Sequence, residues 1–307
     1  MMVVGAAAVS GAARAATGFT VLNDPSAAGG YYPNGGTSAY NQYGSTVVGT
    51  YWDPNFAHAF VETAGVYSTI DPPGTVSSAY ATGVYEDDIV GFYLDANVHV
   101  LGYSYQAGVY SPIDVPGANY TYPTSVFGST VVGYDAVNND TSSNGFVYAG
   151  GQYGVVDYPG AVSTHLEGVW GNTIVGYYFD GAHNHGFSYS GGVFTPITDP
   201  QATGGETFAD GVYGDTIAGT FEENGVYYGF VERGGQFESI TLPTPGVTAV
   251  EVSGVYGKTL IGEFDDGSGQ HGFLLTVPEP STWTMMLGGV FGLGALLRRN
   301  RRLRRAL

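Results

Sequence analysis

Cysteine is absent from this sequence of 307 residues, which excludes disulfide bonds and metal sites with thiolate ligands. Basic residues are scarce: the chain has 27 acidic and nine basic residues, and Arg233 and Lys258 are the only basic residues between positions 15 and 297. An acidic body of this kind opposes binding to nucleic acid and to anionic lipid. A G-x-S-x-G motif, which marks a nucleophile elbow, is also missing. We therefore expect no enzymatic activity, no catalytic residues and no nucleic-acid partner.

A repeated phrase accounts for most of the chain. It consists of an aromatic residue, a short turn, two apolar residues and a glycine, as in the segment 43–49. Successive glycines lie 42 or 43 residues apart, a period that is typical of a propeller blade with four strands. The six copies end at Gly49, Gly91, Gly133, Gly176, Gly219 and Gly262. Because one blade cannot bury its faces alone, the copies predict a single repeat domain over residues 16–276.

The unit at residues 79–117 illustrates the predicted blade. Runs of β-branched and aromatic residues at 79–86, 89–94, 100–106 and 109–115 are separated by turn-forming residues, which predicts four short antiparallel strands. Successive residues within these runs are apolar, so we expect both faces of each blade to be covered. The repeated glycine then marks a close approach between the backbone and its packing partner.

The last unit differs, because the chain runs from residues 271–277 into a proline-containing tail without supplying a fourth strand. Residues 19–24 resemble a third or fourth strand and precede the first complete unit. We expect them to pair with the last unit, so that strands from both ends close a ring without exposed edges. The predicted fold is therefore all-β: a six-bladed β-propeller of four-stranded blades, followed by a C-terminal hydrophobic sorting helix.

One aromatic residue precedes the two apolar residues in every copy of the phrase. The six are Tyr43, Tyr85, Phe127, Trp170, Tyr213 and Tyr256. Exposed rings can bind sugars as apolar platforms with polar tips. One equivalent ring per repeat is better explained by packing between blades, which is the interpretation that we favour. Tyr31 and Tyr32, in a long insert at 27–40, are the better candidates for contact with a ligand.

A second phrase repeats in the predicted third strand, where triplets such as His-Ala-Phe and His-Gly-Phe begin at His58, His185 and His271. The other three copies begin with Leu101, Asn144 and Tyr228. The pattern resembles the HAF family of probable extracellular repeats over roughly residues 40–275. This resemblance implies an exported repeat protein and brings no established biochemical activity.

Acidic residues follow the predicted second strand of each unit. They are Asp53, Asp95, Asp135, Asp180, Glu222, Glu223, Asp265 and Asp266. Carboxylates and turn carbonyls suit Ca²⁺, which prefers several oxygen ligands, whereas Asp beside Gly or Asn also forms hairpin turns without a metal. We favour turn formation and expect no cofactor, with calcium as the alternative. His183 and His185 could share a metal, but a structural or solvated role explains them better.

The first 15 residues are mostly small and apolar and end in Ala13-Arg14-Ala15, which predicts a signal peptide over residues 1–15 with an A-x-A cleavage site. A basic n-region is missing, so we expect either a start further upstream or an atypical signal. The alternative is a short buried strand or helix. A signal peptide makes the secretion machinery a partner of this protein.

The tail at 277–307 combines three features. Pro278, Glu279 and Pro280 precede an apolar stretch at 284–297, whose length is marginal for a membrane span. An arginine cluster follows, which includes Arg298, Arg299, Arg301 and Arg302. Arginines at this place hold the cytoplasmic end of a span in position, by the positive-inside rule.

This tail resembles the PEP-CTERM sorting signal of Gram-negative bacteria. The resemblance implies recognition and cleavage near the Pro-Glu-Pro motif by an exosortase, a membrane transpeptidase-like enzyme. The protein would be anchored transiently in the inner membrane by its C-terminal helix, and would then reach the cell surface or the extracellular matrix. A plain C-terminal anchor is the alternative, and it also places the body outside the cytoplasm.

Three functions remain open. The favoured one is a non-enzymatic protein of the cell surface or matrix, with a structural or exopolysaccharide-associated role. The second is a carbohydrate- or calcium-binding propeller module. The third is a polysaccharide hydrolase or lyase, which requires carboxylates that converge in a pocket, and the sequence does not place them.

Overall fold

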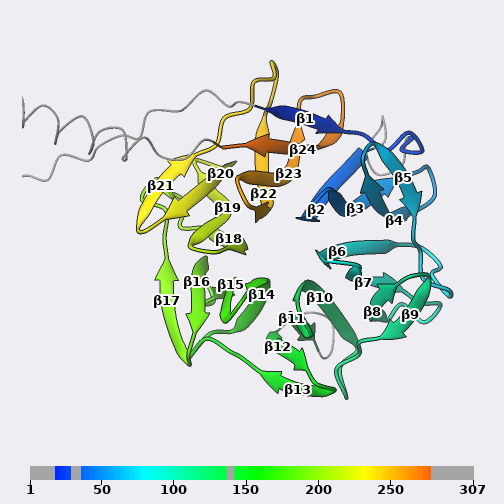
Figure 1. Ribbon diagram of the computed structural model, residues 1–307. Helices are drawn as coiled ribbons and strands as arrows, with labels where there is room; N and C mark the ends of the chain where they lie inside the picture. The colour runs from blue at the N-terminus through cyan, green and yellow to red at the C-terminus, as the bar shows by residue number, and fades with distance from the viewer. Residues whose placement is uncertain (1–17, 29–35, 137–141, 278–307) are drawn as a thin grey trace, which may run out of the picture. The chain divides into compact units, whose positions relative to one another are not determined.

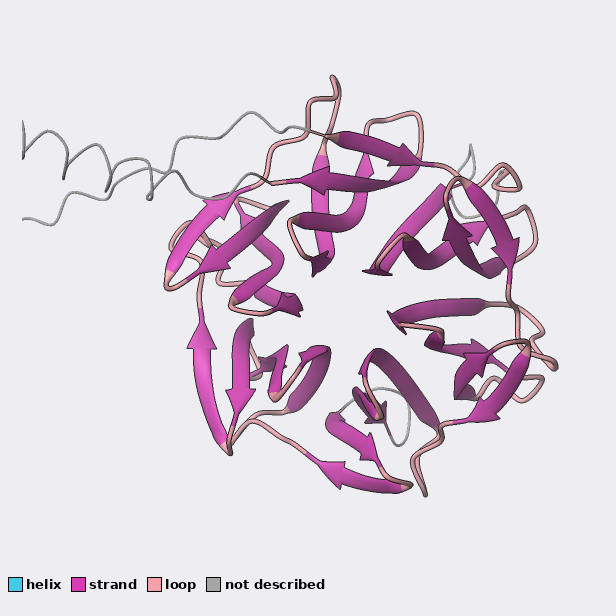
Figure 2. Cartoon of the chain, viewed as in Figure 1, coloured by secondary structure: helices cyan, strands magenta, loops and turns pink. Residues whose placement is uncertain are grey.

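The computed structural model describes residues 18–28, 36–136 and 142–277. These residues form 24 β-strands, which are arranged around a common centre (Figure 1), and their other segments are loops and turns (Figure 2). No helix that could span a membrane is found among the residues that the structure describes. The chain divides after Thr276, and Val277 is the only described residue of the second unit, so the predicted sorting helix lies outside the described residues.

Antiparallel pairing arranges the strands in sets of four, and the first three sets follow one another along the chain. Set 1 comprises β2 (Gly36–Tyr43), β3 (Thr46–Trp52), β4 (Ala57–Thr63) and β5 (Val66–Thr69). Set 2 comprises β6 (Ala79–Tyr85), β7 (Asp88–Leu94), β8 (Val100–Gln106) and β9 (Val109–Pro112). Set 3 comprises β10 (Tyr120–Phe127), β11 (Thr130–Ala136), β12 (Ser143–Ala149) and β13 (Gln152–Val155).

The remaining strands form three further sets. Set 4 comprises β14 (Ser163–Trp170), β15 (Thr173–Phe179), β16 (Asn184–Ser190) and β17 (Val193–Ile197). Set 5 comprises β18 (Thr207–Tyr213), β19 (Thr216–Glu223), β20 (Val226–Arg233) and β21 (Gln236–Ser239). Set 6 comprises β22 (Ala249–Tyr256), β23 (Thr259–Asp265), β24 (Gln270–Thr276) and β1 (Phe19–Leu22). The prediction of an all-β fold built from four-stranded units is confirmed.

Set 6 contains strands from both ends of the described domain. β1 pairs antiparallel with β24, so that Phe19 lies opposite Leu275. The predicted pairing of the segment 19–24 with the last unit is therefore confirmed for β1. A parallel bridge between Gly36 and Gln270 also joins set 6 to set 1 (Figure 1).

Every innermost strand contains a β-bulge at the same position. In β18, the register skips Asp210, which lies between Ala209 and Gly211 and opposes no residue of β19. The repeated glycine of the second strand lies across from this bulge. A Cβ atom on any of the six repeated glycines would come within 1.9–2.1 Å of a backbone oxygen of the innermost strand. The predicted close approach is confirmed, and only glycine fits at these positions.

The hydrophobic core lies between neighbouring sets. Between sets 1 and 2, for example, Val48 and Ala59 pack with Ala81 and Ile89. The aromatic residue of each third strand is fully buried in such a layer: Phe60, Tyr103, Phe146, Phe187, Phe230 and Phe273. Both faces of a set contact a neighbouring set, so consecutive apolar residues of a strand are all removed from water. The burial of apolar surface is the main favourable term in folding.

The six repeated aromatic residues form a closed series of ring contacts, which we call the aromatic belt. Its members, in order, are Tyr43, Tyr85, Phe127, Trp170, Tyr213 and Tyr256. Neighbouring centroids are 4.3–5.2 Å apart, and the last ring contacts the first. Tilted pairs of this kind contribute about 0.5–1.5 kcal/mol each beyond their buried area. The predicted packing of these rings between repeats is confirmed.

Candidate functional site: a central pocket

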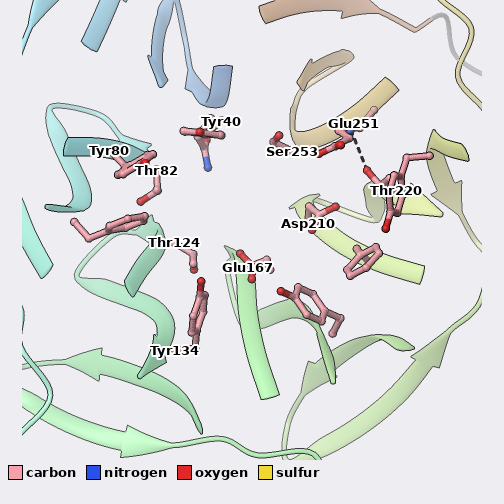
Figure 3. A pocket seen from close by; sticks show the side chains of 16 residues that line it. Tyr40, Tyr80, Thr82, Thr124, Tyr134, Glu167, Asp210, Thr220, Glu251 and Ser253 are labelled. Carbon is pink, nitrogen blue, oxygen red and sulfur yellow. Dashed lines mark hydrogen bonds between the residues drawn. The ribbon is translucent and has the colours of Figure 1, made fainter. Parts of the chain in front are cut away.

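The bulge residue of each innermost strand lies three positions before the aromatic belt and faces the centre of the domain. The six bulge residues are Tyr40, Thr82, Thr124, Glu167, Asp210 and Ser253. All six line a central pocket with a volume of about 640 Å³ (Figure 3). Bulges often occur next to functional sites because they re-aim a side chain. One structural device, repeated in every set, therefore supplies the lining of this pocket.

An arc of aromatic rings runs from set 2 to set 5, and we call it the aromatic arc; all its rings except Tyr122 and His165 line the pocket. Its members, in order, are Tyr80, Phe92, Tyr122, Tyr134, His165, Tyr177 and Phe208, with neighbouring centroids 3.8–5.0 Å apart. The His165 ring bonds to the Ser143 hydroxyl at 2.7 Å and to the Tyr177 hydroxyl at 2.8 Å. Burial lowers the pKa of His165 to about 4, so this ring is neutral near neutral pH.

Carboxyl groups enter the pocket from sets 4, 5 and 6, through Glu167, Asp210 and Glu251 (Figure 3). Burial, and then the neighbouring Asp210 carboxylate, raise the pKa of Glu167 well above its usual range. Burial and then Glu251 have the same effect on the pKa of Asp210. Desolvation also raises the pKa of Glu251, although its side chain is exposed at the pocket. The described lining contains no Lys or Arg. His165 lies 3.8 Å from Glu167, but its lowered pKa leaves the ring neutral near neutral pH, so it gives these acids no positive charge there.

Two bulge threonines show the structural role that a bulge side chain can take. The Thr82 hydroxyl donates to the carbonyl oxygen of Pro123 at 2.6 Å, which joins set 2 to set 3. In the same way, the Thr124 hydroxyl donates to the carbonyl oxygen of Leu166 at 2.6 Å. Asp210, at the equivalent place in set 5, makes no hydrogen bond or ion pair with any residue that the structure describes. Its carboxyl group is therefore available to a ligand.

The acids predicted after the second strands lie away from this pocket, and most of them hold turns. Backbone N–H groups of the turns donate to Asp53, Asp95, Asp180, Asp265 and Asp266. The hydrogen bond from the His99 amide is the main cause that lowers the pKa of Asp95. Asp135 differs, because it is buried within β11 and burial raises its pKa. The described residues contain no group of three His, Asp or Glu that could hold a metal ion, and calcium binding stays a prediction.

The repeated histidines reach the same outer turns. Each lies near an acid of its own set: His58–Asp53 at 3.5 Å, His185–Asp180 at 2.9 Å and His271–Asp266 at 3.4 Å. These pairs belong to sets 1, 4 and 6, so the three histidines do not converge on one site. His183 lies 3.5 Å from Glu206 and thus faces a different acid from His185.

Several predicted site residues lie outside the described residues. They are Tyr31 and Tyr32 of the insert, the sorting residues Pro278, Glu279 and Pro280, and the basic residues Arg298, Arg299, Arg301 and Arg302. The predicted signal peptide at 1–15 lies outside them as well. The structure therefore does not place any of these residues in the pocket or away from it.

Sequence reasoning missed the pocket acids, although the repeat carries a signal for two of them. When the innermost strands are aligned on the aromatic belt, the third position before the belt is Tyr, Thr, Thr, Glu, Asp or Ser. The residues around it are mostly apolar or glycine. A position that varies among polar residues inside a repeated apolar strand would have indicated Glu167 and Asp210. Glu251 lies two residues further upstream and has no such signal.

One comparison concerns the tail. Residues 276–302 match the PEP-CTERM protein-sorting motif. The motif indicates an exported protein that exosortase processes and that is anchored transiently in the membrane of a Gram-negative bacterium. This supports the part of the sequence interpretation that rests on the tail. No curated protein matches the sequence.

Solved structures resemble the described domain in fold. The β-propeller domain of the Trilobed protease from Pyrococcus furiosus gives a TM-score of 0.53 at 10% identity, covering 80% of this chain and 94% of that one. A mutant of Trypanosoma rangeli sialidase gives 0.52 at 9% identity, covering 86% and 60%. TolB from Acinetobacter baumannii gives 0.50 at 13% identity, covering 79% and 64%. Such low identities show a propeller-like fold and nothing about activity.

Proposed function

We propose that this is an exported, exosortase-processed protein of the cell surface or extracellular matrix, and that its central pocket binds carbohydrate without turning it over. In this proposal the six sets are the blades of a closed propeller. The observation that carries it is the composition of the pocket, where tyrosine and phenylalanine rings stand beside hydroxyl and carboxyl groups. Rings offer apolar platforms to the faces of a sugar, and oxygen acceptors bind its hydroxyl groups.

The size of the pocket also supports a carbohydrate ligand. Its volume of about 640 Å³ lies within the range of small-molecule sites. A second cavity, of about 20 Å³, is lined by belt residues that include Tyr43 and Trp170, and it has room for about one water molecule. A sugar cannot pass this end, so a carbohydrate chain would enter from the opposite end and place its terminal residues in the pocket.

Two adjacent tyrosines of β20 test the proposal. Tyr227 lines the pocket and is 38% exposed, whereas Tyr228 is 36% exposed and lies outside the lining. We expect saturable binding of the full-length protein, in detergent, to at least one member of a panel of bacterial exopolysaccharides. Tyr227→Ala should weaken this binding by about tenfold, since a lost stacking contact costs up to about 1.5 kcal/mol.

Tyr228→Ala is the matched control, because it removes a ring of equal type and similar exposure from the same strand. We expect it to leave affinity unchanged. Equal losses of affinity in Tyr227→Ala and Tyr228→Ala would show that the carbohydrate binds outside the central pocket. Carbohydrate binding would be contradicted if the protein bound no polysaccharide of the panel saturably while its far-ultraviolet circular dichroism showed β-structure.

The hydrolase or lyase alternative gains one supporting observation, because Glu167, Asp210 and Glu251 bring carboxyl groups into a single pocket. Glycosidases require two such groups on either side of the scissile bond, one of them with a raised pKa. The same panel separates this alternative from binding alone. Release of reducing ends that stops in Asp210→Asn would favour the enzyme, and intact polysaccharide after prolonged incubation would favour the binding protein.

A further inference from the structure

The charge of the pocket is the feature that the proposed function does not explain. A neutral sugar needs acceptors and donors, and uncharged groups can supply both: the Ser253 hydroxyl can donate and accept, and the Thr82 and Thr124 hydroxyl oxygens can accept. Glu167, Asp210 and Glu251 add negative charge on one side, against no cationic residue in the described lining. Burial raises the pKa of Glu167 and of Asp210, and so do the charges of Asp210 on Glu167 and of Glu251 on Asp210, so the charged forms of these acids are disfavoured. A ligand that brings positive charge would offset this cost.

Asp210 shows that this charge is not required by the fold. Its bulge is equivalent to those of Thr82 and Thr124, whose hydroxyl groups bond to the backbone of the next set. The Asp210 carboxyl group instead points into the pocket (Figure 3), where it is partly buried and has no hydrogen-bond or ion-pair partner among the described residues. Threonine occupies the equivalent place in sets 2 and 3 and links each of them to the next set. The carboxyl group therefore has a role toward something that enters the pocket.

The wall opposite the acids carries aromatic rings. Tyr40, Tyr80 and Tyr134 line this side, from sets 1, 2 and 3 (Figure 3). Tyr80 stacks on Phe92, and Tyr134 stacks on both Tyr122 and His165, which holds these rings in place. This wall supplies apolar contacts for the body of a sugar, and the acids supply the charge.

We propose that the pocket binds an amino sugar with a free, protonated amine, at the end of a polysaccharide chain. The ammonium group is placed between the Asp210 carboxylate and its neighbours Glu167 and Glu251, while the sugar ring lies against the tyrosines. The terminal position follows from the aromatic belt, which blocks passage through the centre. This inference rests on the proposed carbohydrate binding and assigns the class of sugar.

The test compares two tetrasaccharides that differ in charge. The full-length protein, in detergent, is titrated calorimetrically with a glucosamine tetrasaccharide and with its N-acetylated counterpart, at a pH below the pKa of the amine. We expect the cationic tetrasaccharide to bind about tenfold more tightly or better, because its ammonium groups can pair with the pocket carboxylates and N-acetyl groups cannot. Asp210→Asn and, separately, Glu251→Gln should each weaken the binding of the cationic tetrasaccharide about tenfold.

Asp87→Asn serves as the control, because it removes the same charge from an exposed turn that does not line the pocket. Equal losses in Asp87→Asn and Asp210→Asn would mean general attraction to an acidic surface, and would overturn the inference. Tight binding of the N-acetylated tetrasaccharide, weakened by Tyr227→Ala, would overturn it too but leave the proposed function intact. The amino-sugar assignment also falls, and carbohydrate binding stands, if neither tetrasaccharide binds while a polysaccharide of the panel does. If nothing binds, both proposals fall.

Discussion

Replacing Gly219 by alanine should lower the free energy of unfolding by about 3–5 kcal/mol, the largest effect that we expect from a single methyl group in this protein. A Cβ atom on Gly219 would lie 2.0 Å from the carbonyl oxygen of Phe208 and 3.1 Å from the Cα atom of Ala209. Both atoms belong to the backbone of β18 next to the bulge, so no side chain can rotate away. The strand would have to move, and with it Asp210.

Gly154→Ala is the matched control for this prediction. Gly154 lies in the outer strand β13, where an added Cβ atom would meet nothing closer than the carbonyl oxygen of Val147, at 3.9 Å. We expect this variant to stay within about 0.5 kcal/mol of the parent. Chemical denaturation of the parent and both variants gives the comparison. Equal stability of Gly219→Ala and the parent would show that the close approach at the repeated glycine does not constrain the fold.

The fold could be predicted from the sequence because the chain repeats. The repeated glycines and aromatic residues each make a contact that recurs in every set, and the period gives the length of one set. Gly219 is repeated because a backbone oxygen lies against it, and Trp170 because its ring contacts the rings of both neighbouring sets. The pairing of β1 with β24 followed from counting strands, since the last unit lacked one. In these cases the sequence pattern and the packing have the same physical cause.

The pocket was not accessible in this way, because its residues are the ones that do not repeat. A bulge is a property of the register between two strands, and its side chain turns to the centre only once both strands are paired. Glu167 and Asp210 therefore read as ordinary polar residues of a strand. The acids that do repeat, such as Asp180, drew attention as ligands, yet backbone N–H groups at a turn account for them. In this chain, the residues that repeat maintain the fold, and the bulge residues that differ between repeats line the pocket.

Replacing Glu263 by glutamine should raise the free energy of unfolding at pH 8 and leave it unchanged near pH 4. Glu263 lies on β23, where its Oε1 atom accepts a hydrogen bond from Gln270 at 2.6 Å. Its Oε2 atom is buried without a hydrogen-bond partner in the described structure. Burial raises the pKa of this carboxyl group from 4.5 to about 7, and the charge of Glu251 adds to the effect.

The sign follows from proton linkage. A carboxyl group whose pKa is higher in the folded state binds its proton more tightly there, so it favours folding below the unfolded pKa and loses this contribution as the pH rises to the folded value. For Glu263 the window is pH 4.5 to about 7. The loss across that window amounts to on the order of 3 kcal/mol, at 1.36 kcal/mol for each unit of pKa. Glutamine keeps the oxygen acceptor for Gln270 and does not ionise.

The difference in stability between Glu263→Gln and the parent, measured by denaturation at several pH values, isolates this group from the other acids. It should be close to zero near pH 4, grow through the window and level off above pH 7. Asp87→Asn, at an exposed turn, should change stability only slightly. A flat curve for Glu263→Gln would contradict the burial of a charged group beside the pocket. A rising curve would show that ionised Glu263 lowers the stability of the folded state by a measurable amount.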